Sequence, residues 1–113
     1  MASTGLRIVS GSQLTTSLAT YGTAVGTARR QRIDKCTVCN DTATARWFTF
    51  HLVPTGGAAD STNKLVYQKV VAAGETYTCP EVVGHWLETG GFIRAIAEAN
   101  TALTLIISGV EIT

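Results

Sequence analysis

Charged residues are scarce in this chain of 113 residues, where Lys, Arg, Asp and Glu together make up 15%. An ordinary soluble domain carries about 25%, so a surface this poor in charge suits a protein that is covered by neighbouring molecules. No run of about 18 apolar residues is present, which excludes a membrane-spanning helix. Residues 1–12 contain no apolar run of signal length, so we expect no export by that route.

Size and composition limit the chain to one compact domain. With 113 residues it is too short for a two-domain enzyme. Thr, Val and Ile together supply 35 residues, which is the composition of a β-protein because branched side chains favour strands.

Cysteine is limited to Cys36, Cys39 and Cys79, an odd number that predicts free thiols and folding in a reducing cytoplasm. The C-x-x-C spacing of the first two also occurs in thiol redox centres and zinc sites. Here it lies in a β-patterned run, where residues three apart point to opposite faces. A zinc site would need a second ligand pair, and only Cys79, His51 and His85 remain. We interpret the cysteines as small packing residues and expect neither a metal nor a cofactor.

The net charge of +1 hides an asymmetry between two parts of the chain. Residues 1–74 hold eight Lys or Arg and three Asp, a net charge of +5, whereas residues 75–113 hold one Arg and five Glu, a net charge of −4. Two interpretations stay open: a chance distribution over the folded surface, or complementary patches for contact between subunits.

The first 27 residues are rich in Ser, Thr, Gly and Ala and carry a single charge, Arg7. Glycine repeatedly interrupts the apolar pattern, so we predict an N-terminal arm over residues 1–27, followed by a β-sandwich domain over residues 28–113. The arm contains one or two weak strands whose apolar residues could pair with a sheet, and it is either disordered or ordered by partners. Its candidate contact residues are the apolar ones, Leu6, Ile8, Leu14 and Leu18.

Two-residue periodicity dominates from residue 28 onward. The segments 32–40 and 46–53 flank an Asn-Asp-Thr turn and predict a hairpin, while Pro80 predicts a short helical turn over residues 80–87. Because strands dominate and βα alternation is missing, we predict an all-β fold, an antiparallel β-sandwich of jelly-roll or Ig-like type. Further strands are expected at 64–71, 76–79, 92–99 and 103–112.

The basic cluster, which consists of Arg29, Arg30 and Arg32, stands at the entry to the first strong strand. Arg30 and Arg32 share one face of that strand and Arg29 faces the other way, so this run alone builds no groove for a phosphate backbone. We therefore do not expect nucleic acid as a partner. We interpret the cluster as a solvated strand end or an interface paired with acidic residues, such as Glu81, Glu88 and Glu98.

No catalytic constellation is visible, so we expect the protein not to be an enzyme. His51 and His85 have no Ser or Cys partner in a nucleophile motif. The carboxylates form no metal-binding or paired acid–base pattern.

Four short segments resemble small β-rich structural proteins encoded in tailed-bacteriophage genomes. They are residues 36–40 (CTVCN), 48–54 (FTFHLVP), 72–77 (AAGETY) and 108–112 (SGVEI). The resemblance extends from about residue 33 to the C-terminus and consists of turn chemistry and sheet patterning. It implies a virion protein, at the capsid, neck, tail or fibre attachment, that folds in the host cytoplasm and functions by burying faces and edge strands.

Our leading hypothesis is a non-enzymatic structural subunit of a tailed-phage virion that binds capsid, neck or tail proteins and forms homo-oligomers. An alternative is a carbohydrate- or ligand-binding module of a receptor-binding appendage. That alternative requires solvent-facing aromatic side chains in a concavity, for which Trp47, Trp86 and Tyr77 are the candidates. A third and weaker hypothesis is a single-strand nucleic-acid binder, since Trp47 and its neighbouring phenylalanines could stack bases on an open sheet.

Overall fold

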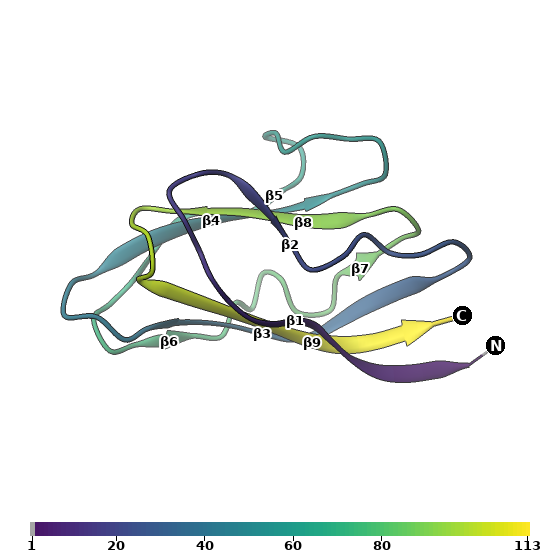
Figure 1. Ribbon diagram of the computed structural model, residues 1–113, viewed down its shortest axis with the longest axis horizontal. Coiled ribbons are helices and arrows are strands. Elements are labelled where there is room, and N and C mark those ends of the chain that lie inside the picture. The colour runs from purple at the N-terminus through teal and green to yellow at the C-terminus, as the bar shows by residue number, and fades with distance from the viewer. Residues whose placement is uncertain (1) are drawn as a thin grey trace.

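The computed structural model describes residues 2–113 and contains two antiparallel sheets packed face to face (Figure 1). Sheet A has the strand order β1–β9–β3–β6, with β7 also paired to β3, and sheet B has the order β2–β8–β4–β5. The described residues contain no helix, so the prediction of an all-β antiparallel sandwich is confirmed. The strands are β1 (Ser3–Gln13), β2 (Ala19–Tyr21), β3 (Arg30–Asn40), β4 (Arg46–Val53), β5 (Lys64–Val71), β6 (Thr76–Tyr77), β7 (Trp86–Leu87), β8 (Phe92–Ala97) and β9 (Leu103–Ile112).

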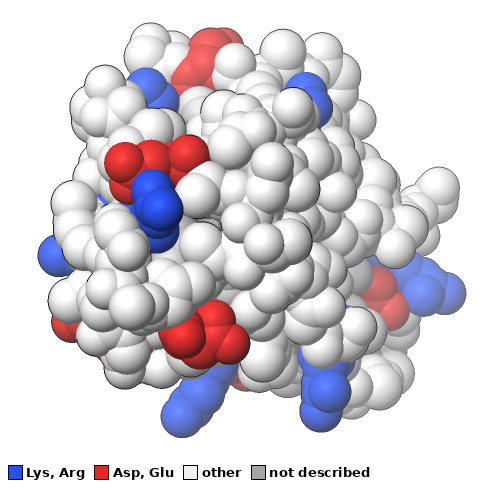
Figure 2. All heavy atoms as spheres, turned by 60° about the vertical axis from the view of Figure 1, so that its left-hand side comes forward, with Lys and Arg blue, Asp and Glu red and all other residues white. Residues whose placement is uncertain are grey.

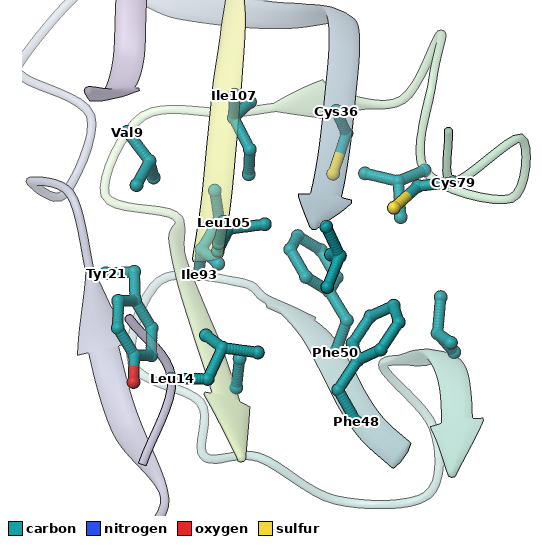
Figure 3. Close-up of a cluster of buried hydrophobic side chains, with 14 of the residues drawn as sticks. Val9, Leu14, Tyr21, Cys36, Phe48, Phe50, Cys79, Ile93, Leu105 and Ile107 are labelled. Carbon is teal, nitrogen blue, oxygen red and sulfur yellow. The ribbon is translucent and has the colours of Figure 1, made fainter. Parts of the chain in front are cut away.

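The core lies between the sheets, because alternate residues of the long strands point inward. Phe48 and Phe50 of β4 are fully buried and face Leu105 and Ile107 of β9 across the sandwich (Figure 3). Burying a large apolar side chain stabilises a fold by about 1.5–3 kcal/mol relative to leaving it exposed. These inward rows therefore fix which face of each strand meets solvent.

Residues 2–27, the described part of the predicted arm, do not form an arm beside the sandwich. Residues 3–13 form β1, which pairs with β9, and β2 pairs with β8, so both strands belong to the two sheets. The physical reason is that Val9, Leu14 and Val25 supply core side chains, each 3% exposed or less. Gly11 lies at a register shift of β1 and, like Gly22, has positive φ, whereas Gly5 lies in the regular part of the strand.

The predicted hairpin between residues 32–40 and 46–53 is wrong. The two strands lie in different sheets, where β3 pairs with β9 and β4 pairs with β5 and β8. The turn between them instead crosses from one sheet to the other. Asn40 holds this corner, since its buried side chain donates to the carbonyls of Thr44 and Val71, both at 2.9 Å, and accepts the Thr42 N–H at 3.0 Å.

The predicted helical turn over residues 80–87 is not formed as a helix. The chain makes hydrogen-bonded turns here, in which the Val82 N–H donates to the Cys79 carbonyl at 3.0 Å. Positive φ values at Cys79 and Gly84 divert the backbone on both sides of that turn. Trp86 and Leu87 then return to β3 as β7. The strand predicted at 76–79 is correspondingly short and ends at Tyr77.

Candidate interaction surfaces

Each arginine of the basic cluster has a carboxylate partner within the chain. Arg30 binds Glu88 with two hydrogen bonds of 2.8 Å, and Arg29 reaches Glu111 at 3.1 Å. Arg32 contacts Asp34 at 2.7 Å. Two of these three ion pairs join the positive part of the sequence to the negative part, so the charge asymmetry along the chain is partly neutralised within the fold.

The Trp86 ring organises the same cluster on the outer side of sheet A. The guanidinium carbon of Arg30 lies 4.4 Å from the ring centre and that of Arg32 lies 5.7 Å from it. Hydrogen bonding to Glu88 raises the pKa of Arg30, and hydrogen bonding to Asp34 raises the pKa of Arg32. Both cations therefore stay charged, and a carboxylate beside each of them offsets part of the positive charge that would attract a phosphate backbone.

The four apolar contact candidates do not form one surface. Leu14 is 0% exposed and belongs to the core, so it is not available for a partner. Leu6 and Ile8 are half-buried on β1, and Ile8 packs against the core. Leu18 lies apart from them, on the outer side of sheet B.

The outer side of β1, which we call the β1 edge, is an unpaired strand edge. Within residues 2–113, β1 pairs only with β9. The register is regular over Ser3–Arg7 and shifts twice beyond it, so the first half of the strand is the straight part. Arg7 is the only charged residue in β1. Unpaired edges with few charges are templates for pairing with another chain.

One end of the sandwich carries β6 and the β8–β9 connection. Figure 2 shows separate patches of acidic and basic side chains on this face, with neutral surface between them.

The outer face of sheet B contains a hollow of about 360 Å³ that sequence analysis did not predict. Its floor includes Thr49 and His51, which are 5% and 7% exposed although they point away from the core. Two-residue periodicity within β4 places Trp47, Thr49 and His51 on the same face of the strand. This pattern is the signal that the sequence contains, but it does not reveal the loop and the neighbouring strand that surround the face. We call this site the sheet B hollow; its other lining residues are Leu18, Trp47, Ala59, Asp60, Ser61, Lys64, Tyr67, Gln68 and Ile96.

A β-bulge shapes the rim of the sheet B hollow. Two residues of β5, Tyr67 and Gln68, lie opposite one residue of β4, Thr49. Gln68 has φ +44°, and among the described residues it is the only non-glycine residue inside a strand with positive φ. Its N–H donates to the Thr49 hydroxyl at 3.0 Å. Bulges re-aim side chains, and here Tyr67 is left 65% exposed.

The candidate aromatic side chains do not separate the structural hypothesis from the ligand-binding one, because Trp47, Trp86 and Tyr77 are all half-buried. Tyr67 is the strongly exposed aromatic residue, and the sequence analysis did not select it. Its position in the bulge is a tertiary feature that alternation does not encode.

Two of the three free thiols lie in the core. Cys36 and Cys79 are buried, and their sulfur atoms face the same part of the core (Figure 3). A hydrogen bond with Cys79, together with burial, raises the pKa of the Cys36 thiol, so it stays protonated. Cys39 lies half-buried on the opposite face of β3. This arrangement fits the interpretation of the buried pair as packing residues.

Within residues 2–113, no group of three or more His, Cys, Asp or Glu side chains is arranged to hold a metal ion. The same part of the chain contains no helix with the length and apolarity needed to cross a membrane. Comparisons with known proteins add no further constraint: no family model matches the sequence, and no curated protein or solved structure is significantly similar.

Proposed function

We propose that the protein is a non-enzymatic structural subunit of a tailed-bacteriophage virion, which forms homo-oligomers and binds capsid, neck or tail proteins. The observation that carries this proposal is the β1 edge. An unpaired strand with a single charge is the kind of edge that soluble monomers usually protect. Here the straight part, Ser3–Arg7, is open to pairing with another subunit.

We also propose that the sandwich is a jelly roll. In a jelly roll the strands pair as in one long hairpin, with the first strand beside the last. The structure contains these pairs: β1 with β9, β2 with β8, β3 with β6 and β7, and β4 with β5. Rolling that hairpin brings β9 beside β3 and β8 beside β4, which are the remaining pairs of the two sheets. Jelly rolls are common in viral capsid and lectin domains. One fold can have many functions, so the jelly-roll topology is compatible with a virion protein but does not by itself indicate that function.

The cysteines and the basic cluster agree with this function. Assembly in a reducing host cytoplasm is compatible with the free thiols Cys36, Cys39 and Cys79. The ion pairs of Arg29, Arg30 and Arg32 do not favour the nucleic-acid hypothesis. Virion contacts would therefore depend on backbone pairing and neutral surface rather than on a charged patch.

The proposal is tested by measuring the native mass of the purified protein and its binding to isolated virions. We expect the protein to form defined oligomers or to bind to virions. Its copy number should fit the symmetry of one part of the particle, such as the capsid, the neck or the tail. Gly5→Lys adds a charge to the β1 edge where a side chain would meet nothing within 4 Å. It should weaken association about tenfold, equivalent to about 1.4 kcal/mol.

The matched control is Ala73→Lys, an equal charge at an exposed position in the β5–β6 turn. It should associate like the unmodified chain. A protein that stays monomeric and binds no particle component would overturn the proposal, and so would equal effects of the two substitutions on association.

A further inference from the structure

We propose that the sheet B hollow is a binding site for a saccharide. This inference goes beyond the structural role and does not rest on it, because the hollow lies on sheet B, whereas the β1 edge belongs to sheet A. A sugar ring offers apolar C–H faces that pack on aromatic rings, together with hydroxyls that both donate and accept hydrogen bonds. A saccharide site therefore needs exposed aromatic surface beside fixed polar groups.

The aromatic surface is supplied by Tyr67 and Trp47. Tyr67 is 65% exposed and is displayed by the bulge at Gln68, so strand pairing does not use it. The Lys64 ammonium lies 4.4 Å from the centre of the Tyr67 ring, which orients the ring and places a donor beside it. The half-buried Trp47 lines the same hollow from β4.

The polar floor has a defined hydrogen-bonding pattern at His51. The Asn63 side-chain amide donates to the Ala58 carbonyl at 2.9 Å, which directs its oxygen towards His51. Since that oxygen accepts at 2.8 Å from Nδ1, the neutral imidazole carries its proton on Nδ1. Nε2 is then a lone-pair acceptor on a ring that lines the hollow, which suits a sugar hydroxyl.

The 54–63 loop adds an oriented carboxylate. One oxygen of Asp60, Oδ1, accepts from both the hydroxyl and the N–H of Thr62, at 2.6 and 2.8 Å. These hydrogen bonds lower the pKa of Asp60, so its carboxylate is ionised at neutral pH. Asp60 is exposed, so its carboxylate can also accept hydrogen bonds from a ligand. Carboxylates accept hydrogen bonds from pairs of hydroxyl groups, the feature that distinguishes sugars from most apolar ligands.

The size of the hollow and the chemistry of β5 favour a small ligand over a second protein chain. About 360 Å³ is near the lower end of the range for small-molecule sites, roughly 300–1,000 Å³. Lys64 and Lys69, together with the bulge, protect this strand edge against pairing with another strand. The rim therefore excludes a sheet partner while it displays an aromatic ring.

The test is a nuclear magnetic resonance titration of the uniformly ¹⁵N-labelled full chain with single sugars. The probes are D-glucose, D-galactose, N-acetyl-D-glucosamine, L-rhamnose and D-glucuronate, each raised to roughly 50 mM, so that a site with a dissociation constant in the low millimolar range would be mostly occupied. We expect at least one sugar to shift the signals of Tyr67, His51 and the Trp47 indole. The Trp86 indole lies outside the hollow and should not move.

Tyr67→Ala should weaken binding of that sugar at least tenfold, and Tyr67→Phe should keep most of it because the ring remains. The matched control is Val70→Ala, which trims another exposed apolar residue of β5 that does not line the hollow. Shifts in none of the five titrations would overturn the inference. So would equal binding by Tyr67→Ala and Val70→Ala.

A second protein chain as the true occupant is a separate outcome. If Tyr67→Ala dissociates an oligomer in sedimentation and no sugar shifts the hollow, the site is a protein interface and the inference is wrong. The structural role is tested separately, by the effect of Gly5→Lys on association at the β1 edge. Failure of the saccharide inference would therefore not imply failure of the structural proposal.

Discussion

The strands β1 and β5 occupy equivalent positions, each at the edge of one sheet of the sandwich, yet they differ in chemistry. β1 has one charged residue, Arg7, and a straight half in regular register with β9. β5 has two lysines, a left-handed residue at Gln68 and exposed Tyr67 and Val70. Topology alone would assign both strands the same role.

The role of a strand edge therefore depends on which groups can pair with it, and not on its place in the sheet alone. A straight edge with little charge presents its N–H and C=O groups in the spacing that another strand needs. A bulged edge breaks that spacing and turns side chains outward. We therefore associate the β1 edge with assembly and the β5 rim with side-chain recognition, and the following variants test this contrast.

The largest effect is expected where β1 is attached to the body of sheet A. Gly109 of β9 lies opposite Leu6 on one side and Ile33 on the other. A Cβ at this position would collide with the Arg32 carbonyl oxygen, so β9 and β3 would have to separate. Gly109→Ala should lower the free energy of unfolding by about 3 kcal/mol or more, measured by urea denaturation.

The control is Gly5→Ala, one rung away on β1, where an added Cβ meets nothing within 4 Å. It should change stability by no more than about 1 kcal/mol. Equal changes in the free energy of unfolding for Gly109→Ala and Gly5→Ala would contradict this prediction. They would show that the close approach of β9 to β3 at Gly109 does not stabilise sheet A.

The second effect concerns the hydrogen bond that supports the β5 bulge. Thr49→Val keeps the shape of the side chain and removes the oxygen that accepts the Gln68 N–H at 3.0 Å. Because Gln68 is exposed, water can replace the lost partner, so we expect a loss of about 1 kcal/mol in urea denaturation. Amide exchange at Gln68 should become faster.

Thr20→Val is the matched control on β2, because it makes the same substitution at an exposed position of the same sheet. It should lie within about 0.5 kcal/mol of the unmodified chain. Unchanged exchange at Gln68 in Thr49→Val would show that the bulge does not depend on this hydroxyl.

Sequence periodicity predicted the class of fold because strands with one buried face repeat every second residue. It predicted the opposite facing of Cys36 and Cys39 correctly, since Cys36 is buried in the core and Cys39 is half-buried on the other face of β3. Periodicity wrongly predicted a hairpin around the turn after Asn40. A polar turn between two strands has the same sequence pattern whether the chain stays in one sheet or crosses to the other.

The same limitation explains the N-terminal segment and the sheet B hollow. Residues 3–13 contain little apolar pattern of their own, and their strand structure comes from pairing with β9, which is distant in sequence. The hollow requires Trp47, His51 and Tyr67 from two strands together with the 54–63 loop. Contacts of this kind depend on register and bulges, which a single sequence does not display.

The smallest effect, and the one that most directly sharpens the contrast between the two edges, is expected at Gln68 itself. A non-glycine residue at φ +44° costs about 1 kcal/mol, whereas glycine adopts this conformation freely but loses more backbone entropy on folding. The two contributions nearly cancel, so Gln68→Gly should leave stability unchanged or raise it by about 0.5 kcal/mol in thermal denaturation. Lys69, one residue further along the strand, has no positive φ, so Lys69→Gly removes no backbone strain. This variant should lower the free energy of unfolding by about 0.5–1 kcal/mol. A loss of stability in Lys69→Gly without a loss in Gln68→Gly would show that the backbone at Gln68 is strained in the bulge. Equal losses in the two variants would mean that the bulge contains no such strain.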